Sequence, residues 1–583
     1  MSARELITDH LDLWTGAVTQ KRSGGRGNNG KIELTGIKKL RELILELAVR
    51  GKLVEQDPSD EPASVLLERI AEEKARLVKE GKIKKPRQLP KLAGMEKPFD
   101  LPNGWSWGQL EDVGHDWGQK QPDQQLTYID VSAIDNIKGE IRRPEVISAD
   151  DAPSRARKKV MPGTLIYSTV RPYLQNIAVL EDQFDPEPIA STAFAVINPL
   201  GGIPARFLLH YLRSPAFVRY VESVQSGIAY PAINDKQFFS GLVPIPPALE
   251  QHRIVEKVDE LMALCDRLEQ QVGDQLEAHE VLVDTLLDAL TRSADAAEVT
   301  ASWARIAEHF DTLFTTEASI DKLKQTILQL AVMGRLVEQD PNDEPASVLL
   351  QRIAEEKARL VKEGKIKKPK KLLEVAEEEK SFEAPHNWAF TRMTELYDLQ
   401  NGYAFKSGWF SHSGIKLLRN INISHGVIDW SECALLPESM ASEYQRFSLR
   451  SGDLVISLDR PLISTGLKYS VVKEKDLPCL LLQRVARFQP YSDTVITRYL
   501  EYWLNSAMFT SSIDPGRSNG VPHISTGQIG KVVFPLPPKD EQHRIVDKVD
   551  ELMALCDQLK ARLGEAGATR THLAEAVVEQ AVN

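Results

Sequence analysis

The stretch PIPPALEQHRIVEKVDELMALCDRLEQQV, residues Pro244 to Val272, occurs twice in this sequence. It returns as PLPPKDEQHRIVDKVDELMALCDQLKARL from Pro535 to Leu563, and 17 of the 19 positions from Glu250 to Leu268 are identical in the second copy. Each copy opens with a proline pair, which suits the first turn of a helix and prevents helix before it. A long helix is therefore predicted to begin here in both halves of the chain.

Apolar residues inside each copy recur at alternating steps of four and three. In the first copy they are Ile254, Val258, Leu261, Cys265, Leu268 and Val272. This spacing is typical of a coiled-coil seam, and the second copy of the helix is its expected partner. The alternative is two unrelated amphipathic helices, each packed on its own domain.

A second block repeats upstream of each domain. Gly51 to Pro86 recurs as Gly334 to Pro369 with three differences in 36 positions. We expect a helix ended by Gly51 or Gly334, and then a second helix capped by Ser64 or Ser347. The first copy also carries an insertion around KRSGGRGNNGK, residues 21–31, which is interpreted as a flexible linker rather than a dinucleotide-binding loop because no strand precedes its glycines.

Between arm and long helix lies a diverged segment of roughly 150 residues in each half. Its landmarks still align: PGTLIYSTVRP with SGDLVISLDRP, and AYPAIND with GVPHIST. Short β-rich runs alternate with turns and one helix-like stretch, which indicates an α+β domain.

The predicted fold is α+β, with two such domains joined by long antiparallel coiled-coil helices in a pseudo-two-fold internal repeat. The expected segments are an arm at 1–98 with a flexible 16–35 insertion, a domain at 99–247, a long helix at 248–295, a second arm at 296–380, a second domain at 381–537 and a final helix at 538–583.

The 583 residues carry 83 acidic and 72 basic side chains, a formal charge of −11. A sequence-blind DNA binder would be basic, so any DNA site must be local. Four cysteines form no disulfide framework, and neither a signal peptide nor a long apolar run is present. We therefore expect a cytoplasmic protein.

Repeated scaffolds with diverged domains suggest one kind of partner met twice and two different targets. Two readers on one spacer fit a DNA site with two unlike half-sites, about one helical turn (~34–36 Å) apart.

With these motifs the chain resembles the specificity subunit of type I restriction–modification enzymes, in the long form with a duplicated arm. The resemblance covers nearly the whole length and is carried by the PPxxEQHRIVxKVDELMxLCD helix and the GKIKK-ending arm, each present twice. It implies that each target-recognition domain reads half of a bipartite, asymmetric site in double-stranded DNA. It also implies assembly with two adenine-methyltransferase subunits and two restriction/translocase subunits, which dock on the repeated helices.

The residues themselves agree with a non-catalytic subunit. The sequence contains no GxxxxGK[ST] phosphate loop and no methyltransferase motif, and no cofactor or metal is expected. The ExK pairs Glu72/Lys74 and Glu355/Lys357 lie in mid-helix, where surface charge patterning is the simpler interpretation than a nuclease site.

DNA contacts are expected from arginine, lysine, serine, asparagine and glutamine side chains in the loops of the two domains. The candidates in the first domain are Gln119, Lys120, Asp130, Ser132, Arg171, Tyr173, Tyr230 and Asn234. Those in the second are Lys406, Ser407, Arg419, Asn420, Arg460, Arg517, Ser518, Asn519 and His523. Arg171 and Arg460 could instead hold a framework turn, and Trp105 and Trp388 are assigned to the core.

Two rival functions stay open at this point. A tandem coiled-coil scaffold that binds proteins without reading DNA is favoured slightly by the net acidity. A self-contained magnesium nuclease would need a carboxylate pair that the sequence does not reveal.

Overall fold

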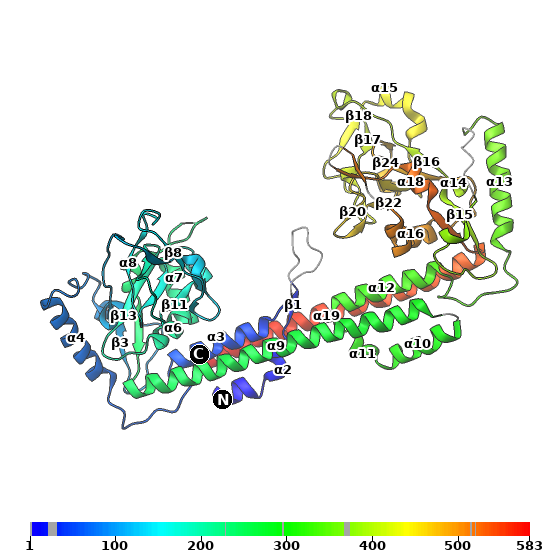
Figure 1. Cartoon of the computed structure of the whole chain (residues 1–583). Coiled ribbons are helices and arrows are strands. Elements are labelled where there is room, and N and C mark those ends of the chain that lie inside the picture. Colours follow the sequence, from blue (N-terminus) through cyan, green and yellow to red (C-terminus); the bar gives the residue numbers. More distant parts are fainter. Residues whose placement is uncertain are drawn as a thin grey trace. The chain divides into compact units, whose positions relative to one another are not determined.

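The computed structural model describes residues 3–20, 32–227, 229–293, 296–366, 374–513, 516–518 and 521–582. The described residues form two compact units (Figure 1): 3–20, 32–274 and 567–582 belong to the first, and those between 275 and 566 belong to the second. The predicted linker at 21–31 lies outside the described residues. Among the described residues, no helix combines the length and apolarity needed to span a bilayer.

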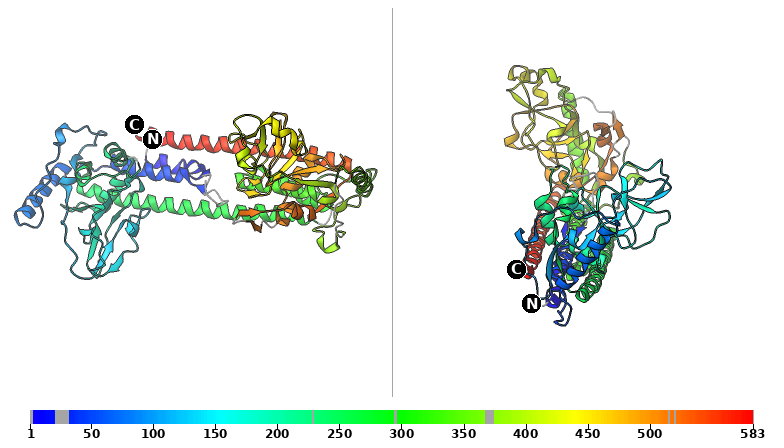
Figure 2. Two further views of the ribbon diagram at one scale, coloured as in Figure 1. Left: turned by 90° about the horizontal axis from the view of Figure 1, so that it is seen from above. Right: turned by 90° about the vertical axis from the view of Figure 1, so that its left-hand side faces the viewer.

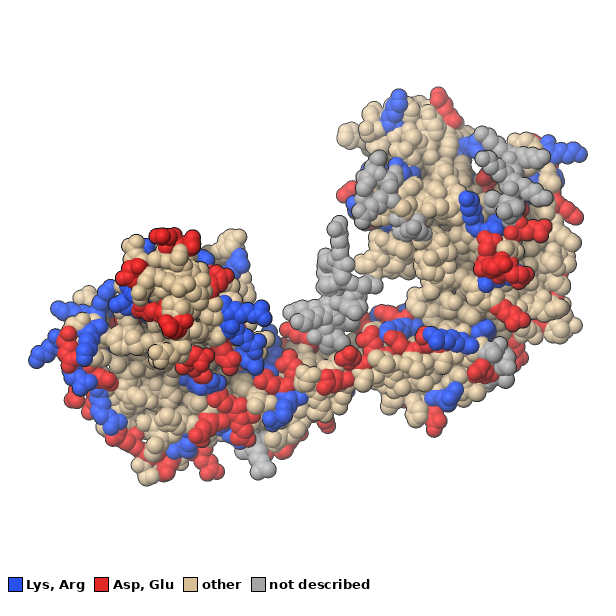
Figure 3. Space-filling view, in the orientation of Figure 1, with Lys and Arg blue, Asp and Glu red and all other residues tan. Residues whose placement is uncertain are grey.

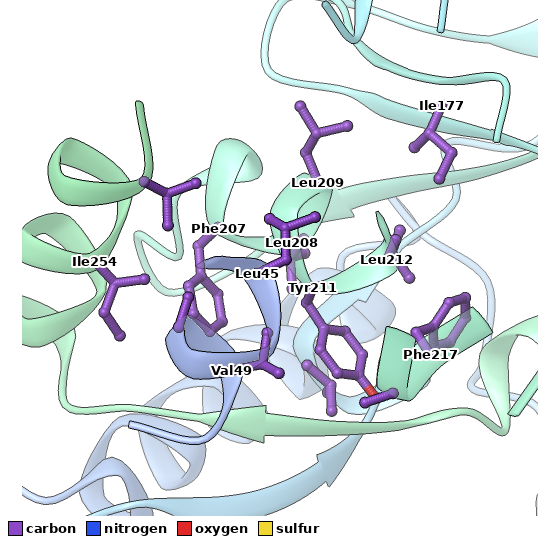
Figure 4. Packing of buried hydrophobic residues seen from close by; sticks show 14 of the residues in the cluster. Leu45, Val49, Ile177, Phe207, Leu208, Leu209, Tyr211, Leu212, Phe217 and Ile254 are labelled. Atoms are coloured by element: carbon purple, nitrogen blue, oxygen red, sulfur yellow. The ribbon is translucent and has the colours of Figure 1, made fainter. Parts of the chain in front are cut away.

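The two long helices are α9 (Ala248–Arg292) and α19 (Lys539–Val582), and each contributes one part to each unit. In the first unit, α9 packs against the arm helix α3 (Thr35–Val49). Its seam residues Ile254, Val258 and Cys265 are fully buried in one cluster with α3, and Figure 4 shows Ile254 facing the cluster that holds Leu45 and Val49.

The second unit is built in the same way around α12 (Glu317–Val332), which packs with α9 and α19 in one core. Lys560 pairs with Asp321 at 2.8 Å, as Arg41 of α3 pairs with Asp266 at 2.6 Å in the first unit. The apolar periodicity predicted only the other long helix as the partner of each seam. In the structure the arm helix also packs in each core with the long helices. The last turns of α19 complete the first core, where Ala574 is fully buried.

Both arm helices end as predicted. Gly51 and Gly334 follow α3 and α12 with φ of +67° and +69°, a backbone conformation that favours glycine. The predicted serine caps are wrong: α4 (Ala63–Lys79) and α13 (Ala346–Lys362) begin after Pro62 and Pro345, and no side chain caps them. The Ala63 amide instead donates to the Gly104 carbonyl at 2.8 Å, so a tertiary contact replaces the cap.

Helix α4 lies beside strand β3 (Ser106–Gln109) and helix α5 (Leu110–Val113) of the first domain. It is the blue helix at the left edge of that domain in Figure 1 and in the left view of Figure 2. The Lys74 ammonium is buried and donates to the Glu111 and Gly114 carbonyls. Lys357 does the same for the Thr394 carbonyl at 2.9 Å and also pairs with Glu395. The ExK lysines therefore fasten each arm to its domain, which is a structural role.

The first domain contains two four-stranded sheets, ordered β11-β10-β13-β4 and β8-β5-β12-β9, with a parallel β12–β5 pair and otherwise antiparallel neighbours. Its strands are β3 Ser106–Gln109, β4 Gly114–His115, β5 Leu126–Ile129, β6 Ile134–Asp135, β7 Glu140–Ile141, β8 Glu145–Ile147, β9 Ala156–Lys159, β10 Leu165–Ser168, β11 Ile177–Val179, β12 Pro188–Ser191, β13 Phe194–Pro199 and β14 Leu242–Ile245. Its helices are α5 Leu110–Val113, α6 Ala205–Arg213, α7 Pro215–Val224 and α8 Asp235–Phe239. Near the N-terminus lie α1 Ala3–Thr8, α2 Leu11–Gly16, β1 Thr19–Gln20 and β2 Ile32–Glu33.

The second domain repeats this plan with sheets β16-β24-β19-β22 and β18-β17-β23, in which β17 and β23 are parallel. Its strands are β15 Ala389–Arg392, β16 Tyr397–Asn401, β17 Ile415–Leu418, β18 Ala434–Leu436, β19 Leu454–Ser457, β20 Leu462–Ile463, β21 Gly466–Leu467, β22 Tyr469–Val471, β23 Cys479–Leu481, β24 Val485–Pro490, β25 Gly516–Ser518, β26 Val521–His523 and β27 Val533–Leu536. The unit's other helices are α10 Ala296–Glu308, α11 Phe310–Leu313, α14 Met393–Leu396, α15 Glu438–Ala441, α16 Thr497–Asn505, α17 Ala507–Ser512 and α18 Thr526–Lys531.

The first and last segments of each domain meet at the start of its long helix. The first and last strands pair antiparallel, β3 with β14 and β15 with β27. Beside each pair a tryptophan donates to a buried glutamate of the long helix: Trp105 to Glu250 at 3.0 Å and Trp388 to Glu541 at 2.9 Å. The tryptophans are 7% and 8% exposed, so their assignment to the core is confirmed.

Candidate nucleic-acid interface

Both domains contain the same turn after the central strand β10 or β19. Arg171 and Arg460 occupy the left-handed region, with φ of +49° and +46°. The Arg171 amide donates to the Pro231 carbonyl at 2.8 Å, and the Arg460 amide donates to the Pro522 carbonyl at 2.7 Å. The sequence alignment of these turns is therefore reproduced by their backbone geometry.

A hydrogen bond from a serine side chain within each turn also stabilises its backbone. The Ser168 hydroxyl donates to the Val170 carbonyl at 2.9 Å, and the Ser457 hydroxyl donates to the Asp459 carbonyl at 2.7 Å. A non-glycine residue in the left-handed region costs roughly 1–2 kcal/mol. Such a conformation persists only where the surrounding structure enforces it, and residues of this kind cluster at functional sites. An arginine in this conformation in both domains marks the turn as a candidate contact point.

In the first domain the turn meets a second loop. The Arg171 guanidinium lies 4.7 Å from the centre of the Tyr230 ring, and Tyr230 is 67% exposed. Tyr173 is also exposed. Asn234 follows in the same loop, where its side chain caps α8 by accepting from the Gln237 amide at 2.9 Å.

The equivalent place in the second domain carries different side chains. His523 Nδ1 lies 2.7 Å from the Asp459 carboxylate, and Arg484 approaches both, at 3.5 Å from Asp459 and 3.3 Å from His523. Arg460 itself is exposed. Arg484 has a φ of +71° and was not predicted; no local sequence pattern marks it. Arg517 and Ser518 lie in β25, and Asn519 is outside the described residues, so these three stay predictions.

The other candidates of the first domain extend the site unevenly. Gln119 is exposed, and its backbone forms an isolated β-bridge with the backbone of Lys158. The Lys158 ammonium pairs at 3.0 Å with the carboxylate of Asp235, the residue after Asn234. Lys120 is ion-paired with Glu187.

Asp130 is paired with Arg155 at 2.6 Å, and Ser132 is exposed in the short turn that follows. Gln119 is thus linked through Lys158 to Asp235, the neighbour of Asn234, whereas Lys120 and Asp130 form ion pairs within the domain.

The remaining candidates of the second domain divide into two groups. Asn420 lies near the turn, because its carbonyl accepts a hydrogen bond at 2.6 Å from the ammonium of Lys468. Lys468 directly follows β21, the second strand of the small β20–β21 hairpin. Arg419 is tied to the Glu432 carbonyl at 2.5 Å. Lys406 and Ser407 are exposed in their own loop, with the Lys406 ammonium 5.5 Å from the centre of the Trp409 ring.

Charge is distributed rather than concentrated. On the face shown in Figure 3, basic side chains lie among acidic ones on both domains. Within the described ranges, no group of three or more His, Cys, Asp or Glu side chains is placed to hold a metal ion. The repeated turns therefore offer arginine, histidine, amide and aromatic groups that suit the recognition of a nucleic acid.

Comparison with known proteins shows the family of the chain. Residues 102–278 and 385–566 match the family described as the type I restriction modification DNA specificity domain. The specificity subunit of the type I restriction enzyme EcoAI of Escherichia coli is 49% identical over 590 residues, covering 100% of both chains. The EcoEI specificity subunit of the same species is 38% identical over 614 residues, again covering 100% of both.

A solved structure described as the "structural basis underlying complex assembly and conformational transition of the type I R-M system" shares the fold. Its TM-score is 0.51 at 23% identity, over 83% of this chain and 99% of that chain.

The chain is a non-catalytic DNA-recognition subunit with two copies of one α+β domain. It belongs to the specificity subunits of type I restriction–modification enzymes, and as such it acts with DNA and with other subunits of that system. The predicted α+β fold with an internal repeat is confirmed. The rival prediction of a protein scaffold without DNA reading is not favoured by this membership.

Proposed function

We propose that each domain reads one half of a bipartite, asymmetric site in double-stranded DNA. The observation that carries this proposal is that the two domains share one backbone turn but surround it with different side chains. Arg171 and Arg460 occupy the same anchored turn, yet the neighbouring segments present Tyr230 in one domain and His523 with Arg484, from two different connections, in the other. Because base identity is read by side chains in the grooves, different side chains on one frame suit different half-sites.

Within this proposal the residues divide by chemistry. Arginine and lysine bind guanine edges or phosphates, and asparagine and glutamine bind adenine edges. Arg171 and Arg460 are the leading base readers, and Gln119 and Asn420 are candidate readers of adenine. The other contacts come from the residues predicted by sequence: Lys120, Asp130, Ser132, Tyr173, Tyr230, Asn234, Lys406, Ser407, Arg419, Arg517, Ser518, Asn519 and His523.

The repeated arms and long helices bind the partner subunits in this proposal. Two adenine-methyltransferase subunits dock on the two copies, and two restriction/translocase subunits complete the enzyme. The near-identity of the arms supports this, since it extends to exposed positions such as Arg69 and Arg352, while the domains between them have diverged.

The test is to co-express the chain with its methyltransferase subunits and to sequence the methyladenine pattern of the host DNA. A split, asymmetric motif with a fixed gap is expected. Arg171→Ala should relax positions in one half of the motif only, and Arg460→Ala should relax positions in the other half only. If either variant relaxed both halves, the independent-reader proposal would be wrong.

The domain limits 99–247 and 381–537 are tested by exchange. Replacing residues 99–247 with the matching segment of another family member should change one half-site and leave the other half-site intact. Loss of all methylation by a folded, assembled chimera would contradict these limits.

A further inference from the structure

Two exposed apolar side chains follow the anchored arginine in each domain. They are Tyr173 and Leu174 after Arg171–Pro172, which are 57% and 40% exposed. In the second domain they are Leu462 and Ile463 after Arg460–Pro461, which are 41% and 36% exposed. We call residues 173–174 and 462–463 the apolar tips. The domains diverge elsewhere, yet both place two adjacent apolar groups in solvent at the same position of the frame.

The tips are held rigidly from two sides. On one side the arginine amides bind the Pro231 and Pro522 carbonyls, and Pro172 and Pro461 are themselves buried. On the other side the side-chain amide of Asn136 donates to the Leu174 carbonyl at 2.9 Å. In the second domain the Lys468 amide donates to the Pro461 carbonyl at 2.7 Å, while the Lys468 ammonium donates to the Asn420 carbonyl. Exposure of the apolar side chains is therefore built into the frame.

The two tips reach this exposure by different local structures. Residues Pro172–Leu174 form a short 3-10 turn, whereas Leu462–Ile463 pairs with Gly466–Leu467 as a small hairpin. Two backbone solutions that present the same chemistry indicate that the apolar surface itself is what both domains retain.

The candidate reading residues surround this surface. Arg171 and Tyr230 lie beside the first tip, and Arg460, His523 and Arg484 lie beside the second. An apolar side chain gains nothing from a phosphate. On duplex DNA its partners are thymine methyl groups or the faces of bases, and base faces become available only when a step is unstacked.

We propose that the apolar tips are wedges that insert against a base step in each half-site and partly unstack it. This inference rests on the proposed function, since it assumes that each domain binds its own half-site. Two neighbouring apolar groups on a rigid support fit a base face better than a single methyl group, and leucine and isoleucine are among the side chains that kink duplexes in this way.

The test uses the full chain with its co-expressed methyltransferase subunits and duplexes that carry 2-aminopurine at successive positions outside the methylated adenines. Unstacking increases 2-aminopurine fluorescence. The parent complex should raise the signal several-fold at one step in each half-site. The double variant Leu462→Ser/Ile463→Ser should abolish the increase in one half-site and leave the other unchanged. Tyr173→Ser/Leu174→Ser should do the reverse, so that each tip serves as the control for the other.

Val146→Ser is the matched control for loss of an exposed apolar side chain, since Val146 is 54% exposed in strand β8. It should leave both signals unchanged. Persistence of the fluorescence increase in the tip variants would overturn the wedge. So would a loss of affinity on replacing thymine by uracil with no 2-aminopurine response, because that result assigns the tips to methyl contacts. Failure of the parent complex to bind DNA in a salt-dependent way would instead overturn the proposed function itself.

Discussion

At the scale of single residues, the role of the guanidinium of Arg171 and Arg460 can be tested separately from the role of their left-handed backbone conformation. Arg171→Gly and Arg460→Gly remove the guanidinium and suit the positive φ. Relief of roughly 1–2 kcal/mol of strain is offset by the greater freedom of glycine in the unfolded chain, about 0.4–1 kcal/mol. Urea unfolding should therefore give a free energy equal to that of the parent or up to about 1.5 kcal/mol higher, while each variant loses discrimination at one half-site.

Gln175→Gly is the control for this prediction. Gln175 lies in the same connection with a φ of +51°, so its replacement relieves comparable strain without touching Arg171. Its methylation motif should match that of the parent. An equal loss of discrimination in Gln175→Gly would assign the effect to the backbone of the connection and not to the arginine.

The buried glutamates of the long helices predict a dependence of stability on pH. Burial raises the pKa of Glu250 and Glu541, although the tryptophan hydrogen bonds oppose this. Because the pKa is higher in the folded state, the contribution to stability is fully present below the ordinary glutamate pKa and is lost as pH rises through the raised value.

Glu250→Gln keeps this group neutral while retaining an acceptor for Trp105. The free energy of unfolding of the variant should gain on that of the parent as pH rises from about 4 to 7. Glu256→Gln, on the exposed side of the same helix, is the control and should follow the parent. A constant difference between Glu250→Gln and the parent at all pH values would contradict the burial argument.

At the scale of elements, the helix-ending glycines differ in what surrounds them. At Gly51 an added Cβ would lie 2.6 Å from Pro102 Cγ, and at Gly334 it would lie 2.6 Å from Pro385 Cγ. At Gly81 and Gly364 it would meet nothing within 4 Å, although φ is again positive. The first pair is constrained by conformation and by packing, and the second pair by conformation alone.

Gly81→Ala should therefore lower the free energy of unfolding by about 1 kcal/mol. Gly51→Ala should cost about 1–3 kcal/mol more, because the proline and Trp105 beside it must move. Denaturant unfolding of both variants measures the difference. Equal losses would show that the contact with the domain does not limit this helix end.

At the scale of the whole molecule, the core of each unit is assembled from distant parts of the chain. Residues 567–583 belong to the first unit, where Ala574 is buried and Lys52 donates to the Ala581 carbonyl at 3.2 Å. Removing these residues uncovers part of the core that contains α3.

Deletion of 567–583 should therefore raise hydrogen exchange in α3 and leave α12 protected. Full-length His572→Ala, at a side chain that is 81% exposed, is the control and should change neither helix. Equal deprotection of both arm helices would contradict the division into these units.

The sequence by itself determined the repeat, the beginnings of the long helices, the glycine-ended arms and the alignment of the two turns. These features are local, because proline, glycine and apolar spacing act on neighbouring residues. It also determined the family, through motifs that occur twice.

Only the tertiary structure decided how the candidate residues are used. The left-handed arginines depend on carbonyls of Pro231 and Pro522, 60 or more residues away, and Lys74 binds carbonyls across an interface. The αL residue Arg484 and the ion pair of Lys120 have the same kind of origin. Such contacts join segments whose sequences carry no shared period, so their geometry exists only once the cores have brought them together.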